Sequence, residues 1–171
     1  MTYAKDINLQ QRKVDRIQDI NFLAPNNFEF SIDNLTYPNA GFLVTAVNLP
    51  NFSIGSANIA MATRVSPQHA DKVTYDNLTL TFIVDENMVN YLELHDWMLA
   101  QVIQNDNYPR DSKRRDCKLI VNSSNNNAVR RITFVDAFPI DLSPLDFTST
   151  IGSVDYLTCT STFAYSYFKI E

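Results

Sequence analysis

The segment from Thr74 to Gln104 constrains the fold more than any other part of the chain. Between Leu78 and Val84, large apolar residues occupy every second position, and threonines fill two of the positions between them. This period of two predicts a strand with one buried face. Asp85 and Glu86 follow directly. They favour a helix start, because a carboxylate there can accept backbone N–H groups and lies at the positive end of the helix dipole.

The residues after Asp85 predict an amphipathic helix over about 86–104. Apolar residues recur there at spacings of three and four, which indicates a stripe that packs on a sheet. We expect Asn105, Asn107 and Pro109 to end the helix. The predicted stripe consists of Met88, Tyr91, Leu92, His95, Leu99 and Val102, widened by Leu94 and Met98, with Trp97 farther round.

Extended patterns dominate the rest of the chain. Residues 62–72 are expected to be a polar loop or hairpin tip before a strand that starts at Val73, and the two prolines of 137–145 to lead the chain round a corner. With seven or more strands and only three glycines, the sequence predicts a mainly β fold, an antiparallel β-barrel or sandwich with one flanking α-helix. Strands are expected at 28–32, 42–47, 78–84, 117–121 and 129–135, and one long strand at 154–170.

The length of 171 residues predicts a single folded domain over 26–171, preceded by a polar N-terminal arm over 1–25. The arm has two open interpretations: a loosely held terminus, or a segment that orders on a neighbouring subunit. The first twenty residues have no apolar core, so no signal peptide is expected, and no run is long enough to span a bilayer.

The charge is unevenly distributed. The net charge of −5 argues against a general nucleic-acid binder. Residues 110–131 nevertheless hold seven bases and two acids, which leaves 17 acids and 7 bases elsewhere. This basic segment suits a solvated face, a salt-bridged surface between subunits, or, less well, a nucleic-acid-binding hairpin.

Catalytic patterns are absent from the sequence. The two histidines lack zinc-ligand spacing, the three glycines cannot form a phosphate-binding loop, and there is no GxSxG motif. Cys117 and Cys159 are expected to be reduced core thiols. We therefore expect no enzyme activity, no cofactor and no metal.

Four features in a fixed order carry a family resemblance. Leu49 and Pro50 close a strand, and a long excursion then leads to the strand that begins near Tyr75. Asp85 and Glu86 precede a helix that carries Asp96 and Trp97, and a long strand over 157–167 comes last. Over residues 26–170 this succession resembles the tail tube proteins of contractile-tailed, T4-like bacteriophages. It is also similar to their baseplate tube-initiator proteins and to the type VI secretion tube.

The resemblance implies a structural virion protein, assembled in the host cytoplasm, without a membrane anchor. Six copies would form a ring, and rings would stack into the inner tail tube, inside a contractile sheath and above a baseplate. DNA would pass through the lumen without specific binding. The alternatives are a single-ring baseplate initiator or tail terminator of the same fold and, from a different class, a monomeric nucleic-acid-binding β-barrel.

By the same analogy, the excursion over 53–72, the arm and the loop over 105–116 are expected to contact adjacent subunits or rings, and ordinary solvent loops are the other interpretation. The length of the last strand suggests that its outer face contacts more than solvent. The candidate interface residues are Ser53, Ile59, Met61, Arg64, Val65, Pro67, Arg110, Arg114, Arg115, Tyr165 and Tyr167.

Overall fold

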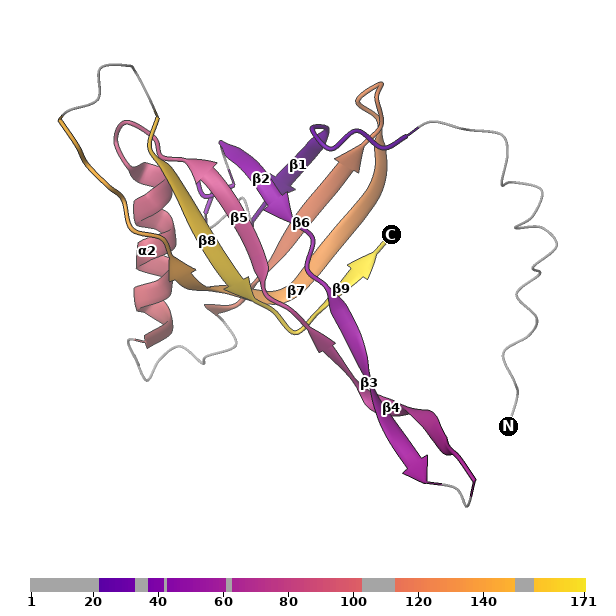
Figure 1. Cartoon of the computed structure of the whole chain (residues 1–171). Helices are drawn as coiled ribbons and strands as arrows, with labels where there is room; N and C mark the ends of the chain where they lie inside the picture. Colours follow the sequence, from indigo (N-terminus) through magenta and orange to yellow (C-terminus); the bar gives the residue numbers. More distant parts are fainter. Residues whose placement is uncertain (1–21, 33–36, 42, 61–62, 103–112, 150–155) are drawn as a thin grey trace.

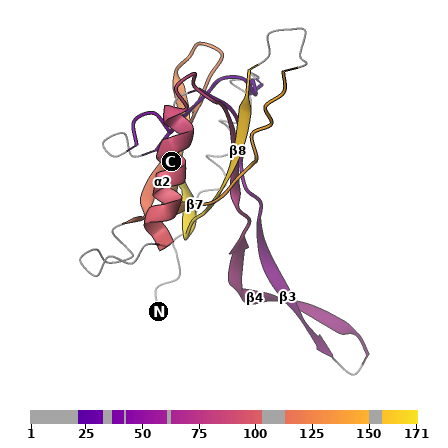
Figure 2. The same ribbon diagram turned by 90° about the vertical axis from the view of Figure 1, so that its left-hand side faces the viewer.

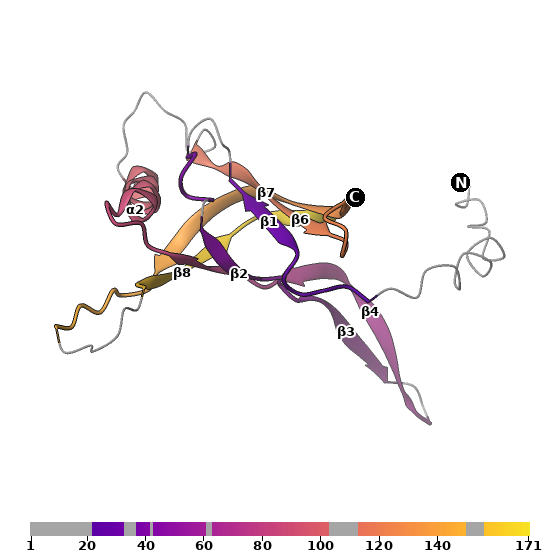
Figure 3. The same cartoon turned by 90° about the horizontal axis from the view of Figure 1, so that it is seen from above.

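The computed structural model describes residues 22–32, 37–41, 43–60, 63–102, 113–149 and 156–171. A body of antiparallel strands carries one helix on one side, and a two-stranded hairpin projects from the other side (Figures 1 and 3). In chain order the elements are β1 (Phe28–Ser31), β2 (Val44–Asn48), β3 (Phe52–Ala60), β4 (Val65–Tyr75), β5 (Leu78–Ile83), α2 (Val89–Val102), β6 (Arg115–Asn122), β7 (Ala128–Leu142), β8 (Thr158–Ala164) and β9 (Tyr167–Ile170).

Strand β7 joins the two halves of the main sheet, whose strand order is β1-β6-β7-β8-β5-β2. Its first part pairs with β6 and β9, and its last part pairs with β8. All of these pairings are antiparallel, so the mainly β, antiparallel prediction is confirmed. Over the residues that the structure describes, the sheet does not close into a barrel, and β1 and β2 form its two ends.

The partner switch of β7 occurs at Asp136, which has a positive φ of 57°. The Asp136 N–H donates to the Asp116 carboxylate (3.1 Å), and the Asp136 carboxylate accepts from the Ser166 hydroxyl (3.2 Å). Aspartate is one of the few residue types that adopt this conformation readily. The sequence placed the corner in the proline segment 137–145, but β7 continues as a strand through Pro139 to Leu142, so that placement is wrong.

The long strand expected over 154–170 is instead two strands, which the chain separates at Tyr165 and Ser166. In β8 the side chain of Phe163 is fully buried, as the alternation predicts. After the break, Phe168 packs against the core, although it lies on the opposite side from Phe163 in a continuous strand. The interruption changes which side chains face inward.

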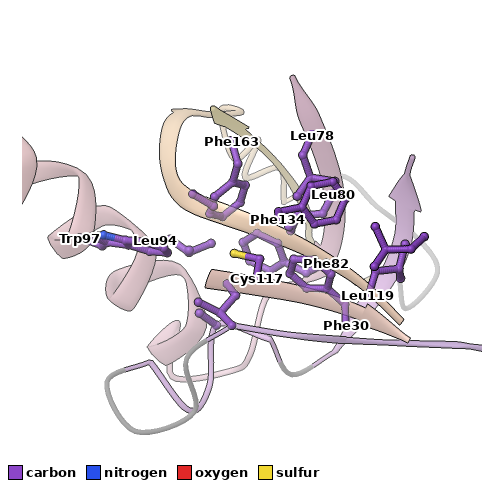
Figure 4. Packing of buried hydrophobic residues seen from close by; sticks show 14 of the residues in the cluster. Phe30, Leu78, Leu80, Phe82, Leu94, Trp97, Cys117, Leu119, Phe134 and Phe163 are labelled. Atoms are coloured by element: carbon purple, nitrogen blue, oxygen red, sulfur yellow. The ribbon is translucent and has the colours of Figure 1, made fainter. Parts of the chain in front are cut away.

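Large side chains from both halves of the sheet and from α2 form one core (Figure 4). Trp97 extends this core onto the helix. Its ring stacks on Tyr37 with centroids 4.6 Å apart, and it lies 5.8 Å from the ring of Phe163. The fully buried large residues are Leu78, Leu80, Phe82, Leu94, Trp97, Cys117, Phe134, Cys159 and Phe163.

The buried face of α2 overlaps the predicted stripe only in part, at Leu94 and the half-buried Tyr91. Asn90, Leu94 and Trp97 face the core, at helical spacings of four and three, whereas Leu92 and Leu99 are 49% and 46% exposed. The indole explains this choice, because its Nε1–H donates to the Lys113 carbonyl (2.8 Å) while the ring fills the space beside Tyr37 and Phe163. His95, predicted on the buried stripe, is exposed and lies 3.3 Å from Asp96.

The helix begins at Val89, and its first turn contains no acid, so the predicted dipole role of Asp85 and Glu86 is wrong. They lie in a preceding turn, where the Asp85 carboxylate accepts from the Asn87 N–H (3.3 Å). Asn90 holds this turn, because its side chain accepts from the Asp85 N–H (3.2 Å) and donates to the Ile83 carbonyl (2.8 Å). This buried amide fixes the strand-to-helix connection.

An aromatic cluster fixes the root of the projecting hairpin to the body. Tyr75 on β4 packs edge-to-face on Phe168 (5.4 Å), and Phe52 on β3 does the same (6.0 Å). The Tyr165 hydroxyl donates to the Asp76 carbonyl (2.8 Å), and its ring packs on Phe134 (5.1 Å). The hairpin therefore leaves the body in a defined direction.

Leu94→Ala should lower the free energy of unfolding by about 2–5 kcal/mol, because it removes a fully buried side chain and leaves a cavity. Leu92→Ala, two residues away on the exposed face, should change it by no more than about 0.5 kcal/mol. Urea unfolding of the two variants measures both values. A larger loss for Leu92→Ala would contradict the helix orientation described above.

Tyr165→Phe should cost about 0.5–1.5 kcal/mol at neutral pH through loss of its hydroxyl hydrogen bond. Burial, followed by the charges of Asp76 and Tyr75, raises the pKa of Tyr165 to about 12 from an ordinary 10.0. The folded state thus holds this proton more tightly, so the stability that depends on it is complete below pH 10.0 and is lost as the pH rises through about 12. Urea unfolding across this range should show a smaller alkaline loss in the variant than in the natural chain. An equal loss in both would contradict the assignment.

Candidate assembly surface

The β3–β4 hairpin is the most exposed regular element of the described chain. Every residue of β3 is exposed, and the hairpin extends away from the body in two perpendicular views (Figures 1 and 2). Its register pairs Phe52 with Tyr75 at the root and Ala60 with Val65 near the tip. The sequence predicted a loop or hairpin tip over 62–72 before a strand at Val73, but β4 already begins at Val65. Pro67 fits this strand, since prolines are tolerated at sheet edges.

The two faces of this hairpin differ in character, because directly paired residues share a face. One face is largely apolar, and the other carries Ser53 with Thr74 and Ile59 with Ser66. The apolar face consists of the pairs Phe52–Tyr75, Ile54–Val73 and Ala60–Val65 together with Pro67, and it is interrupted by the pair Ser56–His69 and by Asn58, the partner of Pro67.

Several side chains of the apolar face are exposed in the subunit: Phe52 (57%), Ile54 (56%), Val65 (61%) and Val73 (44%). A two-stranded hairpin without further cover is at best marginally stable in water. Burying apolar surface against another chain would stabilise it by roughly 25 cal/mol per Å². The geometry therefore suits assembly with other protein chains and provides no site for chemistry.

The structure brings only some of the predicted interface residues together, and their interface role stays a prediction. Tyr165 belongs to the hairpin root, whereas Tyr167 is exposed on β9 with the Lys169 ammonium 5.4 Å from its ring centroid. Met61 and Arg110 lie outside the described residues. On or beside the hairpin lie Ser53, Ile59, Arg64, Val65 and Pro67.

Arg114 and Arg115 lie elsewhere, at the C-terminal end of α2, where they line a cavity of about 390 Å³ together with Asp116 and Lys118. The Lys113 carbonyl accepts hydrogen bonds from Trp97 (2.8 Å) and Gln101 (2.9 Å), which tie this segment to the helix.

Two arginine contacts order this cavity. The Arg114 guanidinium lies over the Phe138 ring (5.5 Å), and Arg115 Nη1 donates to the Arg114 carbonyl (2.9 Å). The result is a positively charged pocket with a fixed wall.

The residues of the family pattern have structural positions. Pro50 and Trp97 are buried, Asp85 is half-buried, and Glu86 and Asp96 are exposed. Leu49 is 46% exposed at the end of β2, close to the hairpin root. Nothing in this set forms a site for catalysis, since its buried members pack and its polar members are dispersed.

The two cysteines of the described chain are unsuited to nucleophilic chemistry. Cys117 and Cys159 are buried free thiols, as predicted. Burial raises the pKa of Cys117, and the negative charge of Asp116 raises it further. Burial also raises the pKa of Cys159. Both thiols therefore stay protonated.

Among the described residues, no group of three or more His, Cys, Asp or Glu side chains could hold a metal ion, and no helix is long and apolar enough to cross a membrane.

Sequence reasoning missed the apolar residues at the hairpin root and the exposed leucines of α2. Phe52 and Ile54 alternate with small residues, and Val73 and Tyr75 repeat the same period on the returning strand. This matched alternation is the signal that could have revealed a hairpin with one apolar face.

Comparisons with known proteins agree with this architecture. A model of the family "Phage tail tube protein" matches residues 7–171. The tail tube terminator protein of Enterobacteria phage T4 is 32% identical over 100 residues, and the aligned region spans 57% of this chain and 57% of that protein.

Solved structures give the same picture of the fold. A chain from the PVC sheath/tube terminator of an extracellular contractile injection system matches with a TM-score of 0.67 at 16% identity, covering 90% of this chain and 99% of the other. A chain from the PVC sheath-tube complex matches with a TM-score of 0.65 at 15% identity, covering 94% and 96%. Since the family match spans nearly the whole sequence, the resemblance seen in the sequence is confirmed: the chain belongs to the phage tail tube protein family and is a structural protein of the phage tail, part of the virion.

Proposed function

We propose that this chain is a tail tube terminator, a protein whose copies form a single ring that ends the tail tube.

 The observation that carries this proposal is the 32% identity to the T4 tail tube terminator, because the solved structures, at 15–16% identity, support the fold alone. The ring would leave a lumen through which DNA passes.

The exposed hairpin supports assembly into a ring. Beyond its root, the apolar face has no cover among the described residues, and the main sheet ends in the open strands β1 and β2. An exposed apolar face and unpaired strand edges both favour aggregation of an isolated chain. Contacts between identical copies would bury the face and pair the edges. Six copies per ring is the number that the family resemblance implies, and we adopt it as part of the proposal.

The second candidate is a subunit of the tube itself, in which rings stack on one another inside a contractile sheath. The match to the phage tail tube protein family favours it. The two candidates differ in one property, since a tube subunit polymerises without limit and a terminator stops after one ring. Sheath and baseplate proteins are expected partners of the tail in either case.

Negative-stain electron microscopy of the purified protein separates the candidates. A terminator should give isolated rings at every protein concentration, and it should bind one end of preformed tail tubes and stop their elongation. Long hollow tubes of this protein alone would support the tube subunit. A monomer that binds DNA in a salt-sensitive manner would contradict both.

Ile54→Asp should prevent ring formation, because it places a charge on the apolar face of the hairpin, where burial against a neighbour would require its desolvation. Ser53→Asp, on the adjacent residue but the opposite face, is the matched control and should assemble at least about tenfold better than Ile54→Asp. Sedimentation velocity gives the ring fraction of each, and circular dichroism establishes that both subunits are folded. Equal assembly of the two variants would show that the apolar face is not the contact surface.

A further inference from the structure

The two ends of α2 have opposite charge. Residues 85–102 contain four acids and no lysine or arginine, and two of these acids, Asp85 and Glu86, form the turn before the helix. Residues 113–118, tied to the other end, contain four bases and one acid. A helix of 14 residues is about 21 Å long at ~1.5 Å per residue, so the acidic turn cannot reach the basic pocket of its own subunit.

The basic pocket is shaped for carboxylates. Among the described residues, its cavity of about 390 Å³ is lined by Arg114, Arg115 and Lys118 and by one acid, Asp116. The Asp116 carboxylate already accepts the Asp136 N–H (3.1 Å). No carboxylate of the described residues forms an ion pair with Arg114 or Lys118. Stacking on Phe138 orients the Arg114 guanidinium, and planar guanidinium groups bind carboxylates through paired hydrogen bonds.

We propose that this pocket receives the carboxylates of the Asp85–Glu86 turn of a neighbouring copy of the chain. The inference rests on the proposed ring, and it names the ionic contact between subunits. A contact that joins one end of a copy to the opposite end of the next is heterologous, and such contacts close into rings when the rotation between copies allows it.

A second copy fits better than nucleic acid. The chain has a net charge of −5, and the segment 85–102 carries four acids without a lysine or arginine, which disfavours a phosphate backbone. Surface ion pairs contribute little affinity each, but they fix orientation and exclude wrong pairings. In the proposed ring, the apolar hairpin supplies most of the affinity between copies, and the basic pocket sets the direction in which the copies join.

Charge exchange tests the contact. Lys118→Glu and Glu86→Lys each place like charges opposite one another, and each should weaken ring formation at least about tenfold in sedimentation velocity at low salt. The double variant carrying both changes should restore the rings, and so should an equal mixture of the two single variants. Lys169→Glu and Asp146→Lys, exposed residues outside the pocket, the turn, the hairpin and the end strands β1 and β2, are the matched controls and should assemble normally.

The outcomes separate this inference from the proposed function. If both single variants lose ring formation and the double variant recovers it, the contact is supported, provided that thermal melting shows folded subunits. If the natural chain forms rings and both single variants form them equally well, the contact is wrong and the ring proposal stands. If Lys118→Glu assembles normally but loses retention of DNA, the pocket binds phosphate and the inference is overturned. If the natural chain forms no rings under any salt condition, the proposed function and this contact both fail.

Discussion

The structure depends on one constraint: the β3–β4 hairpin has an apolar face that its own subunit does not cover. A strand pair of this kind needs support from packing, because backbone pairing alone gives marginal stability. Inside the subunit, support is confined to the root, where Phe52 and Tyr75 pack on Phe168. The rest of the apolar face has no such support among the described residues, so contact with other chains is needed to cover it. Membership of the phage tail tube family supplies the setting in which such chains are present.

The body of the subunit provides the rigid base for this hairpin. Asp136, with its positive φ, lets β7 change partners, and the two halves of the sheet then enclose one core. Trp97 attaches α2 to that core and, through the Lys113 carbonyl, to the segment that begins β6. The hydrogen bonds that Trp97 and Gln101 of the helix donate to the Lys113 carbonyl therefore also position Arg114 and Arg115. Core packing and the basic pocket are consequences of the same local arrangement.

Local patterns predicted most of the strands. The alternation from Leu78 to Val84 predicted β5 and its buried face correctly, because one face of that strand lies entirely in the core. The helix was located correctly, but its buried face was predicted only in part. Its sequence is apolar on two sides, and only the hydrogen bond and stacking of Trp97 decide which side is buried. That decision depends on contacts with Tyr37, Lys113 and Phe163, which are distant in sequence.

The candidate surface was harder to predict than the core. Sequence reasoning expected assembly contacts in the excursion over 53–72, and this expectation stays a prediction. It named Val65 and Pro67 on the apolar face but also Ser53 and Ile59 on the more polar face, and it missed Phe52, Ile54 and Val73. Which residues share a face depends on register, and a shift between Ile54 and Ser56 changes that register within the hairpin. The pairing of Arg114 with Phe138 likewise follows from the tertiary fold.

Hydrogen exchange, measured by mass spectrometry on the separated subunit and on the assembled protein, tests the central claim most directly. If the hairpin is covered by neighbouring copies, the amides of β3 and β4 should exchange at least about tenfold more slowly in the assembly, while those of the buried strand β5 remain equally protected in both states. Equal exchange of β3 and β4 in the two states would contradict the claim that this hairpin is an assembly surface.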